Sequence, residues 1–282
     1  MIINKEEGII VLILKNCTKS FKKTKALNDF SCEFKHGIYG LLGPNGSGKT
    51  TMMRCICGLL SPEKGSIECD CENIGYLPQQ FGAMKSLTVY ETMRYFATLK
   101  KIPKSNQDNE IRYCIDLVNL SDKIKNKVGS LSGGMVRRLG IAQAIMGNPE
   151  IVLFDEPTAG LDPEERVRFK SLLRKIKNDK TIIISTHIVS DVKSICDEIV
   201  IINEGRNVVQ GTCSDITSIG NEKVFLLDEE YENNLEGYYY VKDRISKDNK
   251  NYIIVLSSNF IEQGVSINAD IEDGYLCALK DI

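Results

Sequence analysis

The sequence predicts an α/β protein built on a parallel β-sheet, and three observations lead to this fold class. Apolar runs occur at 38–42 and 151–154, and a third run at 181–185 is apolar between a threonine and a serine, as expected for strands that helices cover on both faces. A helical pattern follows each run, which is the alternation typical of a parallel sheet. A glycine-rich segment, 43–50, connects the first run to its helix.

This glycine-rich segment fits the pattern G-x-x-x-x-G-K-[ST] in full. Its glycines let backbone N–H groups turn toward phosphate oxygens, and the helix start adds partial positive charge. We expect Lys49 to bind the β- and γ-phosphates and Thr50 to bind Mg²⁺. A glycine-rich turn without a ligand is the alternative, and the flanking strand and helix argue against it. The expected contacts are Gly43, Pro44, Asn45, Gly46, Ser47, Gly48, Lys49, Thr50 and Thr51.

The remaining elements follow from hydrophobic periodicity and cap signals. A T-x-x-E capping box at Thr88 opens a largely helical insertion at 85–147. Pro103 and Ser105 interrupt its pattern, so its second helix is predicted to begin near Asn109. Strands are predicted at 9–16, 26–35, 66–69, 74–77, 199–202 and 207–210, and helices at 48–58, 88–99, 109–119, 135–146, 162–177 and 188–196.

Charge separates the end of the chain from the rest. Residues 213–282 hold 14 acidic and 6 basic side chains, whereas residues 1–212 carry a net charge of +6. We therefore predict two domains, 1–212 and 213–282, of which the second is a small α+β appendage with strands at 224–227, 238–241 and 252–256. The mild charge of the first domain lacks the dense basic stripe of nucleic-acid-binding proteins, so nucleic acid is not an expected partner.

Cysteine usage and hydropathy bear on the compartment. Of the ten cysteines, Cys69 and Cys71 are predicted to lie on one face of a strand, without a metal or redox role, because no second pair completes a site. Free buried thiols indicate a reducing compartment. Residues 1–7 do not resemble a signal peptide, and the apolar run at 8–14 is far shorter than the roughly 20 residues of a spanning helix. A soluble chain is expected.

Two acidic residues follow the apolar run at 151–154. Ligands of parallel sheets gather at the carboxyl ends of the strands, so Asp155 and Glu156 are expected beside the phosphate loop. Asp155 can hold Mg²⁺, and Glu156 can take a proton from an attacking water. Such a pair also occurs by chance, and the phosphate loop gives it its significance.

A second phosphate-binding element opens the helix predicted at 135–146. Ser132, Gly133 and Gly134 stand at its start, where helix N–H groups bind anions. One chain that binds one nucleotide does not need two such elements. We therefore expect the second element to bind the nucleotide of another subunit.

Six ordered motifs resemble those of the nucleotide-binding subunit of an ATP-binding cassette (ABC) transporter, over roughly residues 9–212. The resemblance implies a P-loop NTPase core, an antiparallel β-subdomain and a helical subdomain. Met135 departs from the family, which usually has Gln there. The motifs are 43–51 (Walker A), Gln79 within 76–79 (Q-loop), 131–135 (signature), 151–156 (Walker B), 159–162 (D-loop) and 185–187 (H-switch).

The resemblance also implies residue roles and partners. His187 would sense the γ-phosphate, Phe21 would stack on adenine, and Gln79 would ligate Mg²⁺ and the attacking water; a packing histidine and a solvated glutamine are the ordinary alternatives. Two identical or different cassettes would close head to tail around two ATP molecules. A separate permease is implied, which places the chain at the cytoplasmic face of the membrane. The segments 77–79 and 185–189 resemble bacterial export-type or multidrug-type cassettes.

Other ATPases share these motifs. Chromosome-maintenance and DNA-repair ATPases insert long heptad-patterned segments between Walker A and the signature, whereas 80 residues separate Thr50 from Leu131. Translation factors of the superfamily carry two cassettes in one chain. A soluble ATPase that drives iron–sulfur cluster assembly stays as the alternative. A non-enzymatic regulator is disfavoured because Glu156 and His187 are both present.

Overall fold

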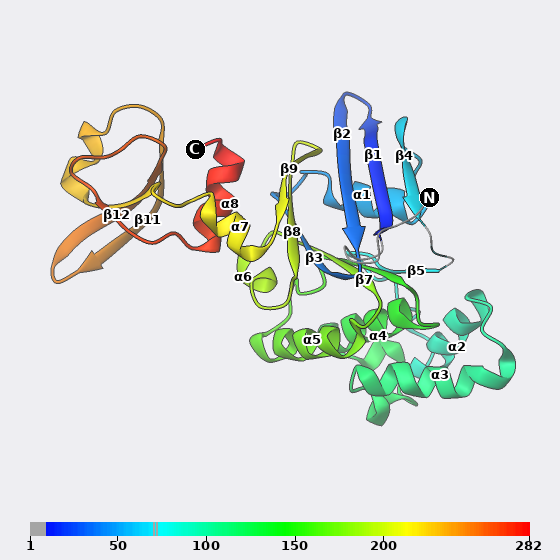
Figure 1. Ribbon diagram of the computed structural model, residues 1–282. Helices are drawn as coiled ribbons and strands as arrows, with labels where there is room; N and C mark the ends of the chain where they lie inside the picture. The colour runs from blue at the N-terminus through cyan, green and yellow to red at the C-terminus, as the bar shows by residue number, and fades with distance from the viewer. Residues whose placement is uncertain (1–9, 70, 72) are drawn as a thin grey trace.

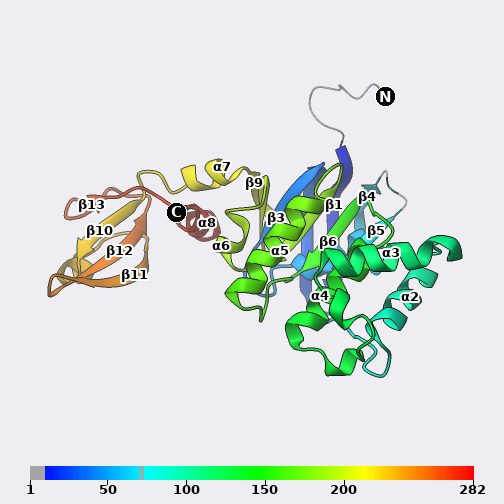
Figure 2. The same cartoon turned by 90° about the horizontal axis from the view of Figure 1, so that it is seen from below.

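A six-stranded β-sheet forms the centre of the computed structural model, which describes residues 10–69, 71 and 73–282 (Figures 1 and 2). The strand order is β5-β6-β7-β3-β8-β9, and only β9 runs antiparallel to its neighbour. The predictions made for residues 1–9 lie outside the described residues. The strands are β3 (Gly37–Leu42), β5 (Ile74–Leu77), β6 (Ile151–Asp155), β7 (Thr181–Thr186), β8 (Glu198–Asn203) and β9 (Arg206–Gly211).

The continuous apolar runs form the buried centre of this sheet, as predicted. Every residue of β6 and β7 is buried. Strand β7 lies between β6 and β3, with Ser185 opposite Asp155 and Thr186 opposite Leu42. The segments that follow β3, β6 and β7 therefore meet at one edge of the sheet.

An antiparallel sheet of order β2-β1-β4 covers helix α1 (Lys49–Ile56), which in turn packs on the central sheet (Figure 1). Met52 and Met53 of α1 share one apolar core with Phe30 of the antiparallel sheet and Leu153 of the central sheet. Strand β1 continues beyond the predicted residue 16. Asn16 takes a positive φ of 49° and the register shifts there, so this irregularity interrupts the pairing and the strand then resumes. The strands are β1 (Ile10–Phe21), β2 (Thr24–Lys35) and β4 (Lys64–Cys69).

Three helices form the predicted helical insertion: α2 (Val89–Leu99), α3 (Lys104–Leu117) and α4 (Gly133–Ile145). The capping box is confirmed: Thr88 Oγ1 accepts from the N–H of Glu91, and Glu91 Oε2 accepts from the N–H of Thr88. The predicted start of the second helix is wrong. Helix α3 begins directly after Pro103, because a proline needs no N–H partner at a helix start and the polar first turn hides the apolar period.

Helix α5 (Pro163–Ile176) begins where the sequence predicts, with Asp162 Oδ1 accepting from the N–H of Glu165. Helix α6 (Val189–Val192) is shorter than the predicted 188–196. The chain must turn after α6 to enter β8, since the N–H of Asp197 donates to the carbonyl of Ile38. The predicted hairpin of β8 and β9 is confirmed.

The C-terminal region contains a four-stranded sheet that lies to one side of the central sheet (Figures 1 and 2). Helix α8 connects the two: Ile271 and Tyr275 pack with β8 and α6, whereas Cys277 packs with Leu256 of the small sheet. The elements are α7 (Cys213–Ser218), β10 (Val224–Asp228), a 3₁₀ turn (Glu229–Asn234), β11 (Tyr239–Lys247), β12 (Lys250–Ser257), β13 (Val265–Ser266) and α8 (Ile271–Lys280).

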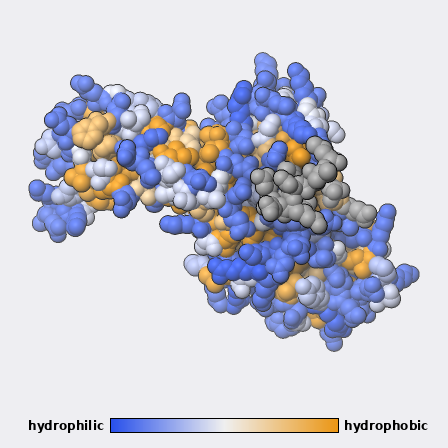
Figure 3. All heavy atoms as spheres, in the orientation of Figure 1, coloured by the Kyte–Doolittle hydropathy of each residue, from blue (hydrophilic) through white to orange (hydrophobic). Residues whose placement is uncertain are grey.

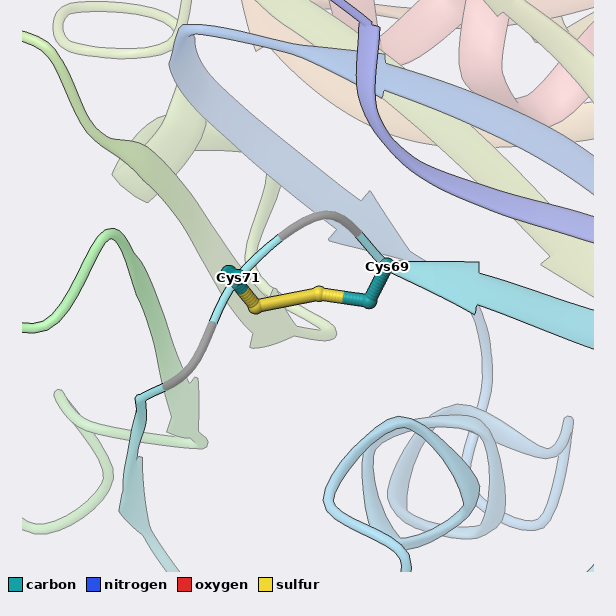
Figure 4. The surroundings of a disulfide bond; sticks show 2 residues. All are labelled: Cys69 and Cys71. Carbon is teal, nitrogen blue, oxygen red and sulfur yellow. A yellow bond between two sulfur atoms is a disulfide. The ribbon is translucent and has the colours of Figure 1, made fainter.

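The prediction for Cys69 and Cys71 is wrong, because a disulfide joins the two residues (Figure 4). Strand β4 ends at Cys69 and the chain bends, so the two Cα atoms are 5.5 Å apart, within the usual range for a disulfide. The eight other cysteines are free thiols, and five of them are buried. Burial raises the pKa of Cys32 and Cys57 to about 12, so these thiols stay protonated.

The face of the molecule seen in Figure 3 is mainly hydrophilic, with apolar residues gathered over the small sheet and its junction with the central region. The most exposed large apolar side chains include Phe260 and Val265, which belong to the C-terminal region. Among the described residues, no helix has both the length and the apolar character needed to span a membrane.

Candidate active site

The loop between β3 and α1 can only be made with glycine at two positions. A Cβ at Gly43 would lie 2.2 Å from the carbonyl oxygen of Ile202, and one at Gly48 would lie 2.3 Å from that of Ala26. Gly48 also takes a φ of 114°, which L side chains rarely adopt. The loop is therefore held against its neighbours in one tight conformation.

Lys49 is buried at the first position of α1. Its Nζ donates to the carbonyls of Gly43 at 2.7 Å and Pro44 at 3.0 Å, and lies 4.0 Å from Oε1 of Glu156. Burial lowers the pKa of Lys49, while the carboxylates of Glu156 and Asp155 act in the opposite direction. The ammonium group is thus placed beside the loop that is expected to hold phosphates.

A cavity of about 410 Å³ opens over this loop. It is lined by seven of the fifteen residues that the sequence predicts for nucleotide and Mg²⁺ binding, together with Glu156. Its lining residues are Ala26, Asn45, Gly46, Gly48, Lys49, Thr50, Thr51, Gln79 and Glu156.

Asp155, at the end of β6, accepts hydrogen bonds from one hydroxyl group of the phosphate-loop segment and one of β7. Its Oδ2 accepts from Thr50 Oγ1 at 2.8 Å and its Oδ1 accepts from Ser185 Oγ at 2.6 Å. The same Ser185 Oγ accepts from the N–H of Glu156 at 2.9 Å. Ser185 thus orients both acidic residues, a role that the sequence reasoning did not assign to it.

Glu156 follows directly, with a positive φ of 49°. For a residue other than glycine, this left-handed conformation costs on the order of 1–2 kcal/mol, and such strain is often found at functional sites. Its carboxylate oxygens both lie 3.1 Å from Nδ1 of His187, just beyond the end of β7. Lys49, Glu156 and His187 are therefore brought together, as the sequence predicts.

The donors at this site fit ATP and Mg²⁺. The Thr50 hydroxyl, the Asp155 carboxylate and the Gln79 side chain supply oxygen ligands of the kind that Mg²⁺ prefers. Ser47 Oγ is buried without a hydrogen-bond partner, although buried hydroxyls are rarely left unpaired. A phosphate oxygen is the partner that such a hydroxyl lacks.

Phe21 and the signature segment lie outside this cavity. Phe21, at the end of β1, is 46% exposed, and Lys19 Nζ lies 5.9 Å from its ring centre. Ser132 caps α4, its Oγ accepting from the N–H of Met135 at 3.3 Å. A Cβ at Gly133 would meet nothing within 4 Å, so the signature segment forms an open surface of the chain.

Arg137 on α4 is the most heavily bonded side chain near the site, and the sequence reasoning missed it. Within the described residues, its guanidinium donates to main-chain carbonyls alone. Two of them belong to the Q-loop, and three belong to the acidic pair Asp155–Glu156 and the residue after it. A positive charge near the start of a helix interacts unfavourably with the helix dipole. An arginine at this position of α4 therefore needs a compensating partner, and this was the signal in the sequence. The acceptors are Pro78, Gln79, Asp155, Glu156 and Pro157.

A phosphate loop, a hydroxyl-bound aspartate and an adjacent glutamate on a parallel sheet define a P-loop nucleoside triphosphatase. A family model described as ABC transporter matches residues 27–159. The ABC transporter ATP-binding protein YxlF of Bacillus subtilis, itself uncharacterised, is 31% identical over 243 residues, covering 84% of this chain and 82% of that protein. The chain therefore belongs to the ABC transporter ATP-binding proteins, a family of ATPases.

Other relatives differ in the direction of transport that their names state. The Nod factor export ATP-binding protein I of Burkholderia lata is 34% identical, covering 70% of this chain and 69% of that protein. The methionine import ATP-binding protein MetN of Carboxydothermus hydrogenoformans is 33% identical, covering 73% and 67%.

Solved structures share the fold. A dimeric ATP-binding cassette in a post-hydrolysis state with ADP and Pi is 26% identical with a TM-score of 0.65, covering 71% of this chain and 98% of that chain. An ATP-binding subunit of an ABC transporter is 24% identical with a TM-score of 0.67, covering 74% and 92%.

Proposed function

We propose that two cassettes close head to tail and hydrolyse two ATP molecules at their interface. One observation carries this proposal: the two phosphate-binding helix starts of one chain do not share a cavity. The loop at 43–50 lines the cavity described above, whereas Ser132 and Gly133 are exposed on an open surface. Each ATP would lie between the loop of one chain and Ser132–Gly134 of the other, with Phe21 against the adenine.

Within each site, the residues of one chain hold the triphosphate. Lys49 exchanges its carbonyl partners for the β- and γ-phosphates, and Ser47 donates its hydroxyl to a phosphate oxygen. Thr50, Asp155 and Gln79 would hold Mg²⁺, which would supply positive charge to stabilise the phosphates. Phosphoryl transfer needs mainly positioning and charge stabilisation, and these side chains supply both.

Glu156 accepts the proton of the attacking water in this mechanism, and His187 contacts the γ-phosphate. The contact between Glu156 and His187, at 3.1 Å, holds the imidazole beside the carboxylate that lines the cavity. The left-handed backbone conformation of Glu156 directs its side chain. Because this conformation is strained, the surrounding structure must maintain it.

The partner that the hydrolysis drives is a separate transmembrane permease, and the direction is export. The export protein among the relatives and the export-type segments 77–79 and 185–189 support this direction. The chain then lies at the cytoplasmic face of the membrane. Its two domains are 1–212, with a helical subdomain at about 85–147, and 213–282.

Glu156→Gln tests the catalytic assignment. The variant should bind ATP and dimerise, but its kcat should fall by about 10²–10⁴-fold, because a general base contributes that much. Glu150→Gln is the matched control. Glu150 is exposed and lies directly before β6, at the opposite end of that strand from Glu156. Hydrolysis by the Glu156 variant at the rate of the control would refute the assignment.

Co-purification tests the permease. The affinity-tagged Glu156→Gln protein is captured with ATP from membranes solubilised in detergent, and bound proteins are identified by mass spectrometry. A protein with several spanning helices is the expected partner, lost when Lys49→Ala replaces the bait. Capture of soluble partners alone would refute a transport function.

A further inference from the structure

Arg137 occupies an unusual position between three motifs. It stands on α4, five residues after Ser132, and its guanidinium reaches the loop after β5 and the segment after β6. Nη1 donates to the carbonyls of Pro78 at 3.0 Å and Gln79 at 2.9 Å. The signature helix is thereby bonded directly to the backbone of the Q-loop.

The other side of the guanidinium binds the acidic pair through its backbone. Nη2 donates to the carbonyls of Asp155 and Glu156, both at 2.6 Å, and Nε donates to that of Pro157 at 3.1 Å. The strained Glu156 residue is thus held from both ends: its N–H donates to Ser185, and its carbonyl accepts from Arg137.

Only arginine can make this set of bonds. A guanidinium carries five N–H donors in a planar fork, whereas an ammonium group carries three on one nitrogen. Burial lowers the pKa of Arg137, and the carboxylates of Asp155 and Glu156 act in the opposite direction. Arginine remains charged under such conditions, which suits it to a partly buried site lined by carbonyls.

We propose that Arg137 is a positioning residue for hydrolysis, which holds the Glu156 backbone in its strained conformation and ties it to the helix that carries Ser132. This inference rests on the proposed role of Glu156 as general base. In the proposed dimer, Ser132 contacts the ATP of the partner, so Arg137 links that contact to the base of its own chain. Its effect should appear in kcat rather than in ATP binding.

Arg138 provides the matched control. It is the next residue of α4 and is also partly buried, and it donates to the carbonyls of Val118 and Asn119 and pairs with Glu165. None of its hydrogen bonds reaches the Q-loop or the acidic pair. Loss of Arg138 therefore reports what a general weakening of α4 does.

The experiment compares Arg137→Met, Arg137→Lys, Arg138→Met and Glu156→Gln in the full chain. Thermal unfolding, the Kd of a fluorescent ATP analogue, and kcat and KM of ATP hydrolysis are measured. We expect Arg137→Met to lower kcat at least tenfold relative to Arg138→Met, with Kd within twofold of wild type. Arg137→Lys should lower kcat at least fivefold, because lysine keeps the charge without the fork.

Two results would overturn the inference. One is a kcat for Arg137→Met within twofold of that for Arg138→Met, or, if the methionine variant does not fold, a kcat for Arg137→Lys equal to that of wild type. The other is a loss confined to Kd or KM. Glu156→Gln separates the two proposals: if it hydrolyses ATP like wild type, the assignment of the base has failed, whereas an inactive Glu156→Gln beside an active Arg137→Met means that only the positioning role has failed.

Discussion

The two glycine-bearing helix starts of this chain are alike in sequence and differ in structure. At the start of α1, a Cβ on Gly48 would collide with a carbonyl oxygen, and Lys49 is buried against the loop. At the start of α4, Gly133 faces open space and Ser132 is exposed. In the proposed dimer, the first element is the half of the ATP site that a chain completes by itself, and the second is the half that a partner covers.

Alanine at Gly48 and at Gly133 should give the largest difference in the free energy of unfolding between the two helix starts. Gly48→Ala should lower the free energy of unfolding by about 2–5 kcal/mol, because it combines backbone strain with a clash against Ala26. Gly133→Ala should leave it unchanged or raise it by up to about 1 kcal/mol, since helical alanine is favoured over glycine. Urea unfolding measures both, and equal losses would remove the structural basis of the comparison.

The far end of α4 offers a pH-dependent prediction. Lys100 Nζ donates to the carbonyls of Gln143, Ala144 and Met146, and burial lowers the pKa of Lys100 to about 8, although the nearby Glu110 opposes this shift. Between about pH 8 and 10.4 the unfolded chain therefore binds more protons than the folded chain, so the free energy of unfolding rises with pH by up to about 3 kcal/mol.

Lys100→Met should abolish that rise while it lowers stability at pH 8, because the carbonyl contacts are lost. Urea unfolding of both proteins at pH 8 and pH 10 gives the comparison. An identical pH dependence in the two proteins would mean that Lys100 titrates as it does in the unfolded chain.

Alanine at Ser47 and at Ser132 should give the smallest difference in the free energy of unfolding. The variant that loses more stability should keep its ATP binding, whereas the other should bind ATP more weakly. Ser132→Ala removes a helix cap and should cost about 1 kcal/mol. Ser47→Ala should cost less than about 0.5 kcal/mol, because Ser47 Oγ has no hydrogen bond to lose. In the monomeric chain, however, only Ser47→Ala should weaken binding of an ATP analogue. A loss of affinity in Ser132→Ala alone would reverse the assignment of the two elements.

Much of the fold could be predicted because its signals are local. The apolar runs of β3, β6 and β7, the capping box at Thr88 and the phosphate loop each show their structure within a few residues. Where local signals misled, a nearby backbone feature was responsible. Pro103 starts α3 rather than ending the helical pattern, and the bend after β4 brings Cys69 and its partner cysteine together.

The candidate site divides in the same way. The motifs placed Lys49, Asp155 and Glu156 at one sheet edge, since parallel strands end together. The particular partners of Arg137 and Ser185 could not be predicted, because they lie 18 to 59 residues away in the sequence and most of them are main-chain atoms, which are the same in every residue. The double role of α8, which packs on both β8 and the small sheet, was also hidden, because its apolar side chains contact segments far away in the sequence.

Complementation between two inactive variants tests the shared site most directly. Lys49→Ala disables the loop, and Gly133→Glu places a negative charge at the exposed signature surface, where a Cβ meets nothing within 4 Å. Each variant alone should hydrolyse ATP poorly. A one-to-one mixture should recover a substantial part of the wild-type activity, because a mixed dimer contains one site in which both halves are intact. A mixture no more active than the two variants separately would contradict a site built from two chains.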